Sequence, residues 1–389
     1  GGASVASTDN GFAGANNPAA AAWSGTRIDA GASIFMPKRG YSRSGSGLGG
    51  LLDGNQESDS NAFLIPEFGY NRALSDKLGV GLTVYGNGGM NTNYAGGNTP
   101  CFNPNPAPGA MFTGNALCGL GKLGVNLMQL VVAPTVAYKL NDNNSIGVSP
   151  LLVYQRFKAE GLQGFGLANA GYDSSNGLGV RLGYFGKLND TTSVGVSYSP
   201  KINMSKFSKY AGLFAGGGEF DIPANLTVGL SAQVTPKVRL ALDYSSIKYG
   251  EIPSIANSAQ TATGPLGDPN GPGFGWSNVS VVKVGVEWQQ SNNLTLRAGV
   301  NVGDNPIKGT DVTFNIIAPG VVTSHVTLGG TYGLSKQSEV TFAYMYAPKK
   351  SVSGPSNFNA PPPAGAGANA TETIQMSQQS IGLQYSWKY

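Results

Sequence analysis

Short segments in which apolar residues alternate with polar or small residues recur along most of the chain. In residues 282–288, one of the clearest, Val and Trp alternate with Lys, Gly and Glu. Successive side chains of a β-strand point to opposite faces, so each such segment predicts a strand with one apolar face. Fourteen strands are predicted, beginning near residues 27, 61, 78, 125, 144, 175, 192, 220, 237, 278, 293, 321, 338 and 374.

The connections between the predicted strands alternate between short and long. Short turns are expected at residues 74–77, 140–143, 189–191, 235–236, 290–292 and 335–337, and long segments at 37–60, 87–124, 158–174, 201–219, 249–277, 304–320 and 349–373. The loops of a two-sheet sandwich would not sort by length in this way. The pattern is typical of an even-stranded, up-and-down transmembrane barrel with periplasmic turns and extracellular loops, which places both chain ends on the periplasmic side.

Composition supports the same class of protein. Only 12% of the 389 residues are charged, against about 25% in soluble domains, and the chain has 58 Gly and 17 Tyr but no run of eighteen apolar residues. Neither a membrane-spanning helix nor a signal peptide is visible, and the chain starts without Met, as a processed chain would. The net charge of +4 without a Lys/Arg cluster argues against a nucleic-acid partner. Aromatic residues gather near predicted strand ends, as membrane-interface girdles require: Tyr70, Tyr138, Tyr244, Trp288, Tyr346 and Trp387.

The first residues, Gly1 to Ser24, are rich in Ala and Gly and show no strand or helix period. Within them, Asn17, Pro18 and Ala19 resemble the start of a short helix, with Asn17 as the N-cap and Pro18 at the first helical position. A fourteen-stranded barrel is wide enough to need filling. We therefore predict a hatch, or plug, at residues 1–25 inside a transmembrane barrel of residues 26–389; the alternative is a disordered terminus.

Two features concern the long segments. Cys101 and Cys118 lie close together, and in an oxidising compartment this spacing predicts a disulfide that closes a loop of about sixteen residues, worth roughly 3 kcal/mol; the alternative is a pair of reduced thiols. Gly86, Asn87, Gly88 and Gly89 follow the third strand where a strand should continue. Such residues are not expected to sustain a ladder, so they predict a kink or bulge that opens the wall, or else the start of a long loop.

Apolar residues in two of the long loops suggest a first docking site for a ligand. Phe207, Tyr210, Leu213 and Phe214 recur at helical spacing in one loop, and Leu162 and Phe165 lie in its neighbour. An apolar patch outside a membrane is a plausible surface for capture of an apolar ligand. The alternative, which is compatible with the first, is that the two loops pack on each other and cap the barrel.

Charged residues occupy the rows expected to face inward: Arg181, Arg239, Asp243, Lys283, Glu287 and Arg297. The three arginines are candidates for a ligand head group, but a lumen network with the acids and hatch carbonyls is favoured because an unpaired buried charge is costly. His325, the one histidine, has no nucleophile motif beside it and is expected to be a hydrogen-bonding residue of the lumen. No metal, cofactor or phosphate-binding pattern appears, and an enzyme is not expected.

Several stretches, in this order along the chain, resemble one family. After the Asn17-Pro18-Ala19 motif come Asp221 to Leu226 with Ala241 to Tyr244, then Leu296 to Gly299 with Asn305-Pro306, and then Ala318-Pro319 to His325 with Thr327 to Gly329. The set is similar to the FadL/TodX-type transporters of the bacterial outer membrane, which carry long-chain fatty acids and other hydrophobic compounds. The sequence begins at the position of the family's AGGA; the tail ahead of it, which helps to occlude the family's ligand pocket, is not in this sequence.

The resemblance implies uptake of hydrophobic small molecules such as long-chain fatty acids or aromatic hydrocarbons. A ligand would be captured at the extracellular loops, enter an apolar pocket inside the barrel, and leave sideways into the bilayer through a kink in the third strand. The expected surroundings are outer membrane lipid and lipopolysaccharide, or detergent once purified, and a monomer is expected. The alternatives are a diffusion porin for polar solutes with a disordered N-terminus, and a non-transport surface adhesin that works through its long loops.

Overall fold

Fourteen strands of the chain form one antiparallel ring. The computed structural model describes residues 1–50, 52–97, 99–102, 111–359 and 369–389. Within them the main sheet has 15 strands, of which fourteen form the ring and β2 (Gly54–Glu57) lies beside the end of the first. The ring consists, in order, of β1 (Arg27–Ser44), β3 (Phe63–Ala73), β4 (Leu78–Tyr94), β7 (Leu123–Lys139), β8 (Asn144–Glu160), β9 (Asp173–Lys187), β10 (Thr192–Ser199), β11 (Asn225–Thr235), β12 (Val238–Ile247), β13 (Val279–Gln289), β14 (Leu294–Gly303), β15 (Ser324–Gly333), β16 (Ser338–Pro355) and β17 (Thr371–Lys388).

The ring is closed by its first and last strands. β1 pairs with β17 along its whole length, from Arg27 opposite Lys388 to Ser44 opposite Thr371. Closure leaves no strand edge exposed along this junction, as a sheet surrounded by lipid requires. The predicted fold class, a fourteen-stranded antiparallel barrel, is confirmed. None of the helices in the described ranges is long and apolar enough to cross a membrane.

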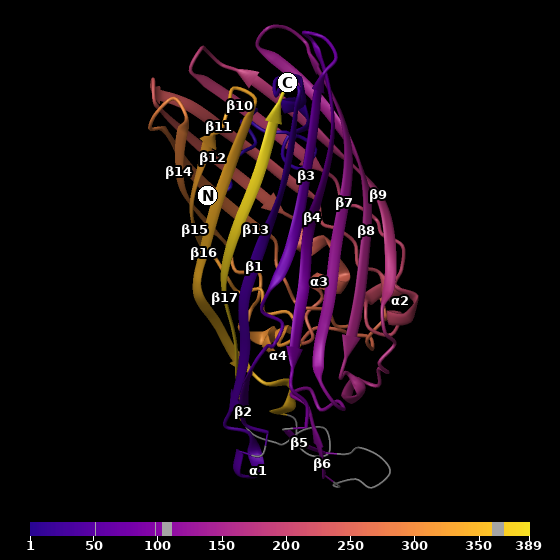
Figure 1. Cartoon of the computed structure of the whole chain (residues 1–389). Helices are drawn as coiled ribbons and strands as arrows, with labels where there is room; N and C mark the ends of the chain where they lie inside the picture. Colours follow the sequence, from indigo (N-terminus) through magenta and orange to yellow (C-terminus); the bar gives the residue numbers. More distant parts are fainter. Residues whose placement is uncertain (51, 98, 103–110, 360–368) are drawn as a thin grey trace.

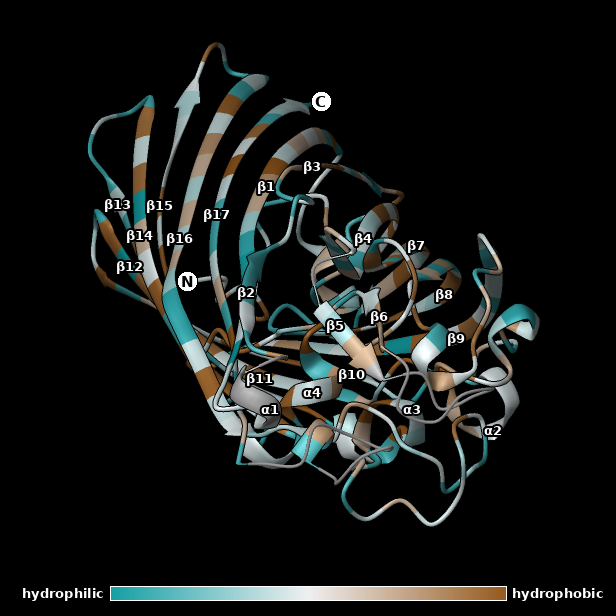
Figure 2. Cartoon of the chain, turned by 90° about the horizontal axis from the view of Figure 1, so that it is seen from below, coloured by the Kyte–Doolittle hydropathy of each residue, from teal (hydrophilic) through white to brown (hydrophobic). Residues whose placement is uncertain are grey.

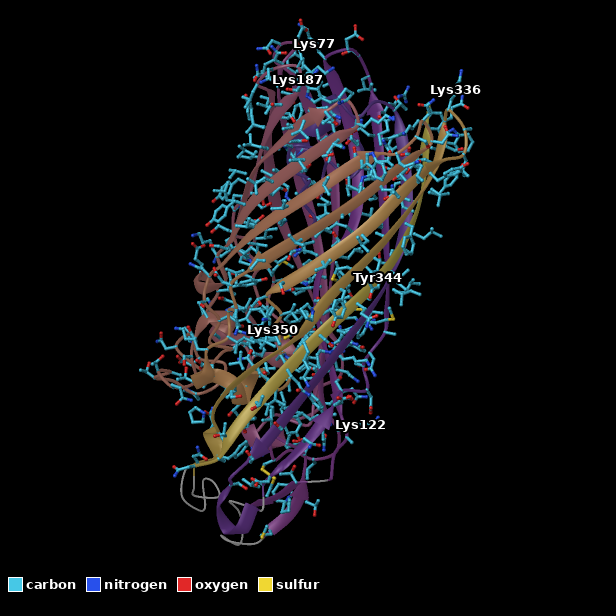
Figure 3. All side chains as sticks on the ribbon, turned by 90° about the vertical axis from the view of Figure 1, so that its left-hand side faces the viewer. Lys77, Lys122, Lys187, Lys336, Tyr344 and Lys350 are labelled. Carbon is cyan, nitrogen blue, oxygen red and sulfur yellow. A yellow bond between two sulfur atoms is a disulfide. The ribbon has the colours of Figure 1, made fainter. Side chains whose placement is uncertain are left out.

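Each strand turns one row of side chains outward and one inward. On β13, Val282, Val284, Val286 and Trp288 are exposed on the outside, whereas Lys283 and Glu287 point inward. Lys77, Lys187 and Lys336 gather at the turn end, and Lys122 lies toward the loop end (Figure 3). The outward face between the two ends is therefore an apolar band of the kind that faces lipid.

The short turns lie at one end of the barrel and the long loops at the other, as predicted (Figure 1). The C-terminus lies at the turn end, where the Tyr389 amide donates to the Thr26 carbonyl at 3.0 Å. Several strands extend farther toward the loop end than predicted: β1 runs to Ser44, β4 to Tyr94 and β16 to Pro355. Beyond the apolar band both faces of a strand carry polar residues, so alternation ceases to mark it there.

The loop end carries short helices and two further strands. These are α1 (Gly47–Gly50), β5 (Thr99–Phe102), β6 (Met111–Gly114), η2 (Gln163–Phe165), η3 (Ser208–Tyr210), α2 (Ala215–Gly218), η4 (Tyr249–Glu251), α3 (Pro253–Ala256), η5 (Gly309–Asp311), α4 (Val312–Asn315) and η6 (Asn357–Asn359). Seen from this end, loops and helices lie across part of the barrel's opening (Figure 2). Buried side chains from several loops form one apolar cluster, here called the loop cap, with Phe207, Ile252, Phe274, Ile316 and Val321 among its members.

The N-terminal segment lies inside the ring. Asn17, fully buried, accepts a hydrogen bond from the Ala19 amide at 3.1 Å and so caps η1 (Pro18–Ala22), which is a 3-10 helix. The Asn17 amide group donates to the carbonyl of Val5 and to that of Tyr184 on β9, both at 2.8 Å. One side chain therefore shapes the segment and attaches it to the wall.

Glycines of the wall allow this close approach. A Cβ atom added to Gly147 of β8 would lie 2.4 Å from the backbone of Pro18 and Ala19, and one on Gly195 of β10 would lie 2.0 Å from the Val5 carbonyl. Gly79 of β4 is equally close to the Ala21 carbonyl. Larger residues at these positions would overlap with backbone atoms, so the inward glycines form the seat of the N-terminal segment.

We expect Gly147→Val to displace this segment while the barrel still folds. Forcing a side chain into a filled site costs about 1–3 kcal/mol, and moving the segment is easier than opening the ladder. The measurement is ion conductance in planar bilayers, which should rise. Gly285→Val is the matched control, because its Cβ would meet no atom closer than 4.0 Å. Equal conductance of the two variants would contradict the account.

Candidate ligand pocket

A cavity of about 280 Å³ lies inside the barrel between the N-terminal segment and the loop cap. Its walls come from β4, β7, β8 and β9 and from the loops that follow β10, β12 and η4. Most of its lining is apolar or aromatic, with residues that include Met90, Leu127, Val131, Leu151, Ile202, Phe220, Ile222, Tyr249, Ile255, Phe274 and Trp276. A small cavity with such a lining is typical of sites that hold apolar ligands.

One wall of the cavity is made by chain that leaves the barrel. After β10 ends, Ile202 and Met204 fold against the inside of β9, where Gly177 and Gly179 have no side chains to obstruct them. Ile202 packs in one buried cluster with Val131 of β7 and Leu151 of β8. The barrel is therefore narrowed at this level by its own apolar residues.

Tyr249 contributes a ring and a hydroxyl to the lining. Its ring meets that of Trp276 edge-on, with centroids 5.3 Å apart. Burial raises the pKa of the Tyr249 hydroxyl above its usual value, so this group stays neutral across the physiological range. The aromatic side of the cavity is therefore uncharged.

The opposite side of the cavity is formed by a stretch of wall that lacks strand pairing. β3 and β4 pair only from Phe68 opposite Val84 to Ala73 opposite Gly79. Beyond Phe68, residues 63–67 of β3 and 85–91 of β4 share no ladder pairs; we call this stretch the seam. Asn87, Gly88 and Gly89 of the seam line the cavity.

The seam contains the bulge that the sequence predicts. The register of β4 against β7 shifts between Gly86 and Gly88, so one extra residue sits on the β4 side. The expectation that Gly86 to Gly89 cannot sustain a ladder is wrong on the β7 side, because pairing with β7 continues to Tyr94, and a long loop does not start here. Backbone hydrogen bonds to a regular neighbour keep these residues extended, and the bulge absorbs their irregularity.

The loop residues proposed for ligand capture lie mainly within the loop cap. Phe207, Tyr210 and Phe214 are buried around Phe157 of β8, with ring centroids 4.7 to 5.8 Å from it. Leu162 is also buried, whereas Leu213 is partly exposed. The buried rings offer no exposed surface as they stand.

Phe165 and Leu213 are the candidates that keep exposed surface. Phe165 is half-buried and packs against Phe314, with ring centroids 5.3 Å apart. Capture of a ligand at these loops stays a prediction. It would use the exposed surface of Phe165 and Leu213, or it would require the loop cap to move so that the buried rings are exposed. The helical spacing in this loop gives only two short elements, η3 and α2, and all three glycines of α2 have positive φ.

Arg181 of β9 joins the cavity to the N-terminal segment. Its Nη1 donates to the carbonyls of Gly14, at 2.8 Å, and Ala15, and to the Tyr85 hydroxyl at 3.1 Å. Its Nε donates to Ser199 at 3.2 Å. The residue also lines the cavity. Its guanidinium therefore already binds carbonyls of the N-terminal segment, one of the two roles considered for it from the sequence.

Arg239 and Arg297 lie elsewhere, in the half of the lumen toward the turns. Arg239 pairs with Asp9 and, at 2.9 Å, with Glu287, and Arg297 pairs with Glu287 at 2.6 Å. Asp243 accepts from the amides of Ser4 and Val5. These groups line a second cavity of about 430 Å³ with many polar walls. The three candidate arginines are thus not brought to one site.

His325 is a hydrogen-bonding residue of the wall. Its Nδ1 lies 2.8 Å from the Asn301 Oδ1, and its Nε2 lies 3.1 Å from the Gln378 Oε1. Both ring nitrogens therefore pair with amide side chains rather than with a serine. In the part of the chain that the structure describes, no group of three or more His, Cys, Asp or Glu is placed to hold a metal ion.

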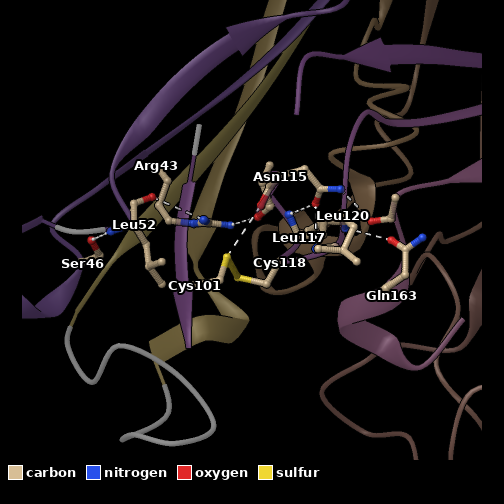
Figure 4. Close-up of a disulfide and its surroundings, with 12 residues drawn as sticks. Arg43, Ser46, Leu52, Cys101, Asn115, Leu117, Cys118, Leu120 and Gln163 are labelled. Atoms are coloured by element: carbon tan, nitrogen blue, oxygen red, sulfur yellow. Dashed lines mark hydrogen bonds between the residues drawn. A yellow bond between two sulfur atoms is a disulfide. The ribbon is translucent and has the colours of Figure 1, made fainter. Parts of the chain in front are cut away.

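Cys101 and Cys118 are joined in a disulfide at the loop end (Figure 4). Asn115 organises the turn beside it by accepting from the Leu117 and Gly119 amides, both at 3.0 Å. Arg43 of β1 donates to the carbonyls of Leu52 and Ala116 in the same region and pairs with the buried Glu372 of β17. The disulfide thus joins two parts of the long loop between β4 and β7, and Arg43 connects that loop to β1.

A family model described as outer membrane protein transport protein (OMPP1/FadL/TodX) matches residues 1–389. The chain belongs to this family. It is therefore an outer membrane protein of a transport family, as its resemblance to the FadL/TodX-type transporters implies. No protein with a curated description matches it in sequence.

Solved structures of the FadL/TodX type share the fold. A FadL homologue of Pseudomonas aeruginosa has 15% identity and a TM-score of 0.69, covering 99% of this chain and 96% of that one. The toluene transporter TodX of Pseudomonas putida has 18% identity and a TM-score of 0.64, covering 97% and 93%. The toluene transporter TbuX of Ralstonia pickettii has 17% identity and a TM-score of 0.63, covering 97% and 93%.

Sequence reasoning missed most of the cavity lining. Ile202, Phe274 and Trp276 lie in segments expected to be extracellular loops, and Ile222 lies in a segment expected to be strand. Nothing in their spacing shows that the chain folds back into this FadL/TodX-type barrel. One signal was available in the sequence. Gly177 and Gly179 leave part of the inward face of β9 without side chains, and the apolar Met204 and Ile202 lie against them. Such a stretch indicates a surface that another segment covers.

Replacing both cysteines by serine should loosen the loop cap and leave the barrel intact. A disulfide of this loop length contributes about 3 kcal/mol, which corresponds to proteolysis of the cap on the order of a hundredfold faster if cleavage follows transient opening. Limited proteolysis measures this, with reduction of the unsubstituted protein as the matched control. Cleavage at an unchanged rate would show that the cap is held by its apolar contacts alone.

Proposed function

We propose that this protein takes up hydrophobic small molecules across the outer membrane. The observation that carries the proposal is the cavity between the N-terminal segment and the loop cap, whose lining is mostly apolar or aromatic and includes Val131, Ile202 and Trp276. Apolar molecules gain free energy on leaving water for such a lining. Related structures are described as toluene transporters, which is consistent with a ligand of this class.

In the proposed route, the N-terminal segment acts as a hatch that blocks the direct path. It is fixed to β9 by Asn17 and to β12 by Asp243, and it lies between the cavity and the turn end. On its way along the barrel axis, a ligand would therefore meet the N-terminal segment toward the turn end and the loop cap toward the loop end. A sideways exit would avoid moving either one.

The seam is our candidate for that exit. Residues 86–89 are exposed, and three of them line the cavity from which the ligand would leave. On the β3 side of the seam, Leu64 points outward and 72% of its surface is exposed, and on the β4 side Gly86 is paired with the outward-facing Leu130 of β7. Both outward residues are apolar, so an exit here would open toward lipid.

Uptake by whole cells tests the proposed function. Cells that lose the protein should take up a labelled long-chain fatty acid or aromatic hydrocarbon several-fold more slowly, with sugar and ion flux unchanged. Ile202→Asn should give the same loss, because it places an amide in the apolar wall. If sugar or ion flux falls instead, the protein is a diffusion porin, and if cell adhesion alone falls, it is an adhesin.

A cross-link over the seam tests the exit. A Cβ on Gly86 would lie 3.4 Å from the Ile65 Cγ2, so the pair Ile65→Cys and Gly86→Cys is within reach of a disulfide after small adjustment. Oxidation should block uptake and reduction should restore it. The matched control is Val284→Cys with Val300→Cys, a pair already opposite each other in the β13–β14 ladder. Uptake that is insensitive to the seam cross-link would exclude the sideways route.

A further inference from the structure

Arg39 of β1 is a buried cation without an acidic partner. Only 6% of its surface is exposed, yet it forms no ion pair among the described residues, and none of the remaining residues is acidic. Its Nε and Nη2 are buried and have no hydrogen-bond partner in the part of the chain that the structure describes. The other buried arginines of this strand differ, since Arg27 pairs with Asp29 and Glu339, and Arg43 pairs with Glu372.

The side chain of Arg39 lies at the seam. Its Nη1 donates to the carbonyl of Asn91 on β4, across the place where β3 would otherwise separate β1 from β4. Its guanidinium lies over the ring of Phe63, the first residue of β3, 5.6 Å from the centroid. Asn91 follows Gly89 and Met90, which line the cavity. Arg39 itself does not line the cavity; its guanidinium lies at the loop end of the seam, against the residue that follows the cavity-lining Met90.

A purely structural role explains only part of this arrangement. Nη1 satisfies an edge carbonyl of β4 that has no partner on β3, but a neutral donor would serve this purpose. Burying a guanidinium costs free energy unless an anion and further hydrogen bonds accompany it. Two unused donors on one planar group match the two oxygens of a carboxylate.

We propose that Arg39 binds the anionic head group of the transported molecule. The ligand is then an amphiphile with an apolar tail in the cavity and a carboxylate, or a comparable anionic group, at the seam. This inference rests on the proposed function and narrows it, because an uncharged hydrocarbon would leave Arg39 without its anion. Arg181 does not take this role, since its Nη1 already serves two hatch carbonyls and a tyrosine.

The test compares two probes with the same tail, tetradecanoate and tetradecan-1-ol, binding to the full chain in nanodiscs. Arg39→Gln should weaken tetradecanoate about tenfold or more, as loss of a charged hydrogen-bonding partner does, and should leave tetradecan-1-ol within about twofold. Lys38→Gln is the matched control, because Lys38 is the exposed neighbouring cation and its loss removes the same charge. Arg39→Lys, which keeps the charge, should retain part of the preference.

Each other outcome has a definite meaning. Equal weakening of both probes by Arg39→Gln makes Arg39 a structural cap of the β4 edge and overturns the inference, while the proposed function stands. Binding of tetradecan-1-ol but not tetradecanoate to the unsubstituted protein does the same. If the carboxylate preference vanishes when the nanodisc lipid is changed from phosphatidylcholine to phosphatidylglycerol, the anion is a bilayer head group and the inference is wrong. Binding of neither probe contradicts the proposed function as well.

Discussion

Backbone hydrogen bonding in lipid is the constraint on which this structure depends. A peptide group that faces hydrocarbon has no water to bond to, so a sheet can cross the membrane only if its strands pair all the way round. The eighteen-pair junction of β1 with β17 meets this requirement where the first and last strands of the barrel come together. Against this background, the seam between β3 and β4 stands out, because there two neighbouring strands run side by side without a shared ladder.

The interior follows from the same closure. A ring of this size encloses more space than its own inward side chains fill, and the chain fills it from both ends. At the turn end, the N-terminal segment packs on glycines such as Gly147 and Gly195. Toward the loop end, Ile202 packs on Gly179. The space that remains inside the barrel includes two cavities. One cavity surrounds the charged Arg239–Glu287–Arg297 network, and the other, lined mostly by apolar and aromatic side chains, lies between the loop cap and the seam.

Much of the fold was predictable because the membrane imposes a period of two on every strand. Alternation located all fourteen ring strands, and the sorting of turns by length gave the direction of the barrel. It failed where the membrane no longer acts: β1 past Met36 and β4 past Gly86 carry small or polar residues on both faces, so they resemble loops although backbone pairing continues to Ser44 and Tyr94.

The candidate site was less predictable because it is assembled from segments without a period. Trp276 and Ile222 reach the cavity through loop paths that only tertiary packing defines. The aromatic residues near 210 were noticed for their spacing, but whether they face water or one another depends on Phe157, from a different strand. Arg39 was not singled out, because its lack of a partner is visible only once every neighbouring carboxylate has been placed.

A crystal structure with a brominated alkyl ligand tests the central claim most directly, since bromine can be located by its anomalous scattering. The account predicts a bromine peak in the cavity between Val131, Ile202 and Trp276, on the seam side of the loop cap. Bromine found only on the lipid-facing outer wall, or in the polar cavity near Arg239, would contradict it.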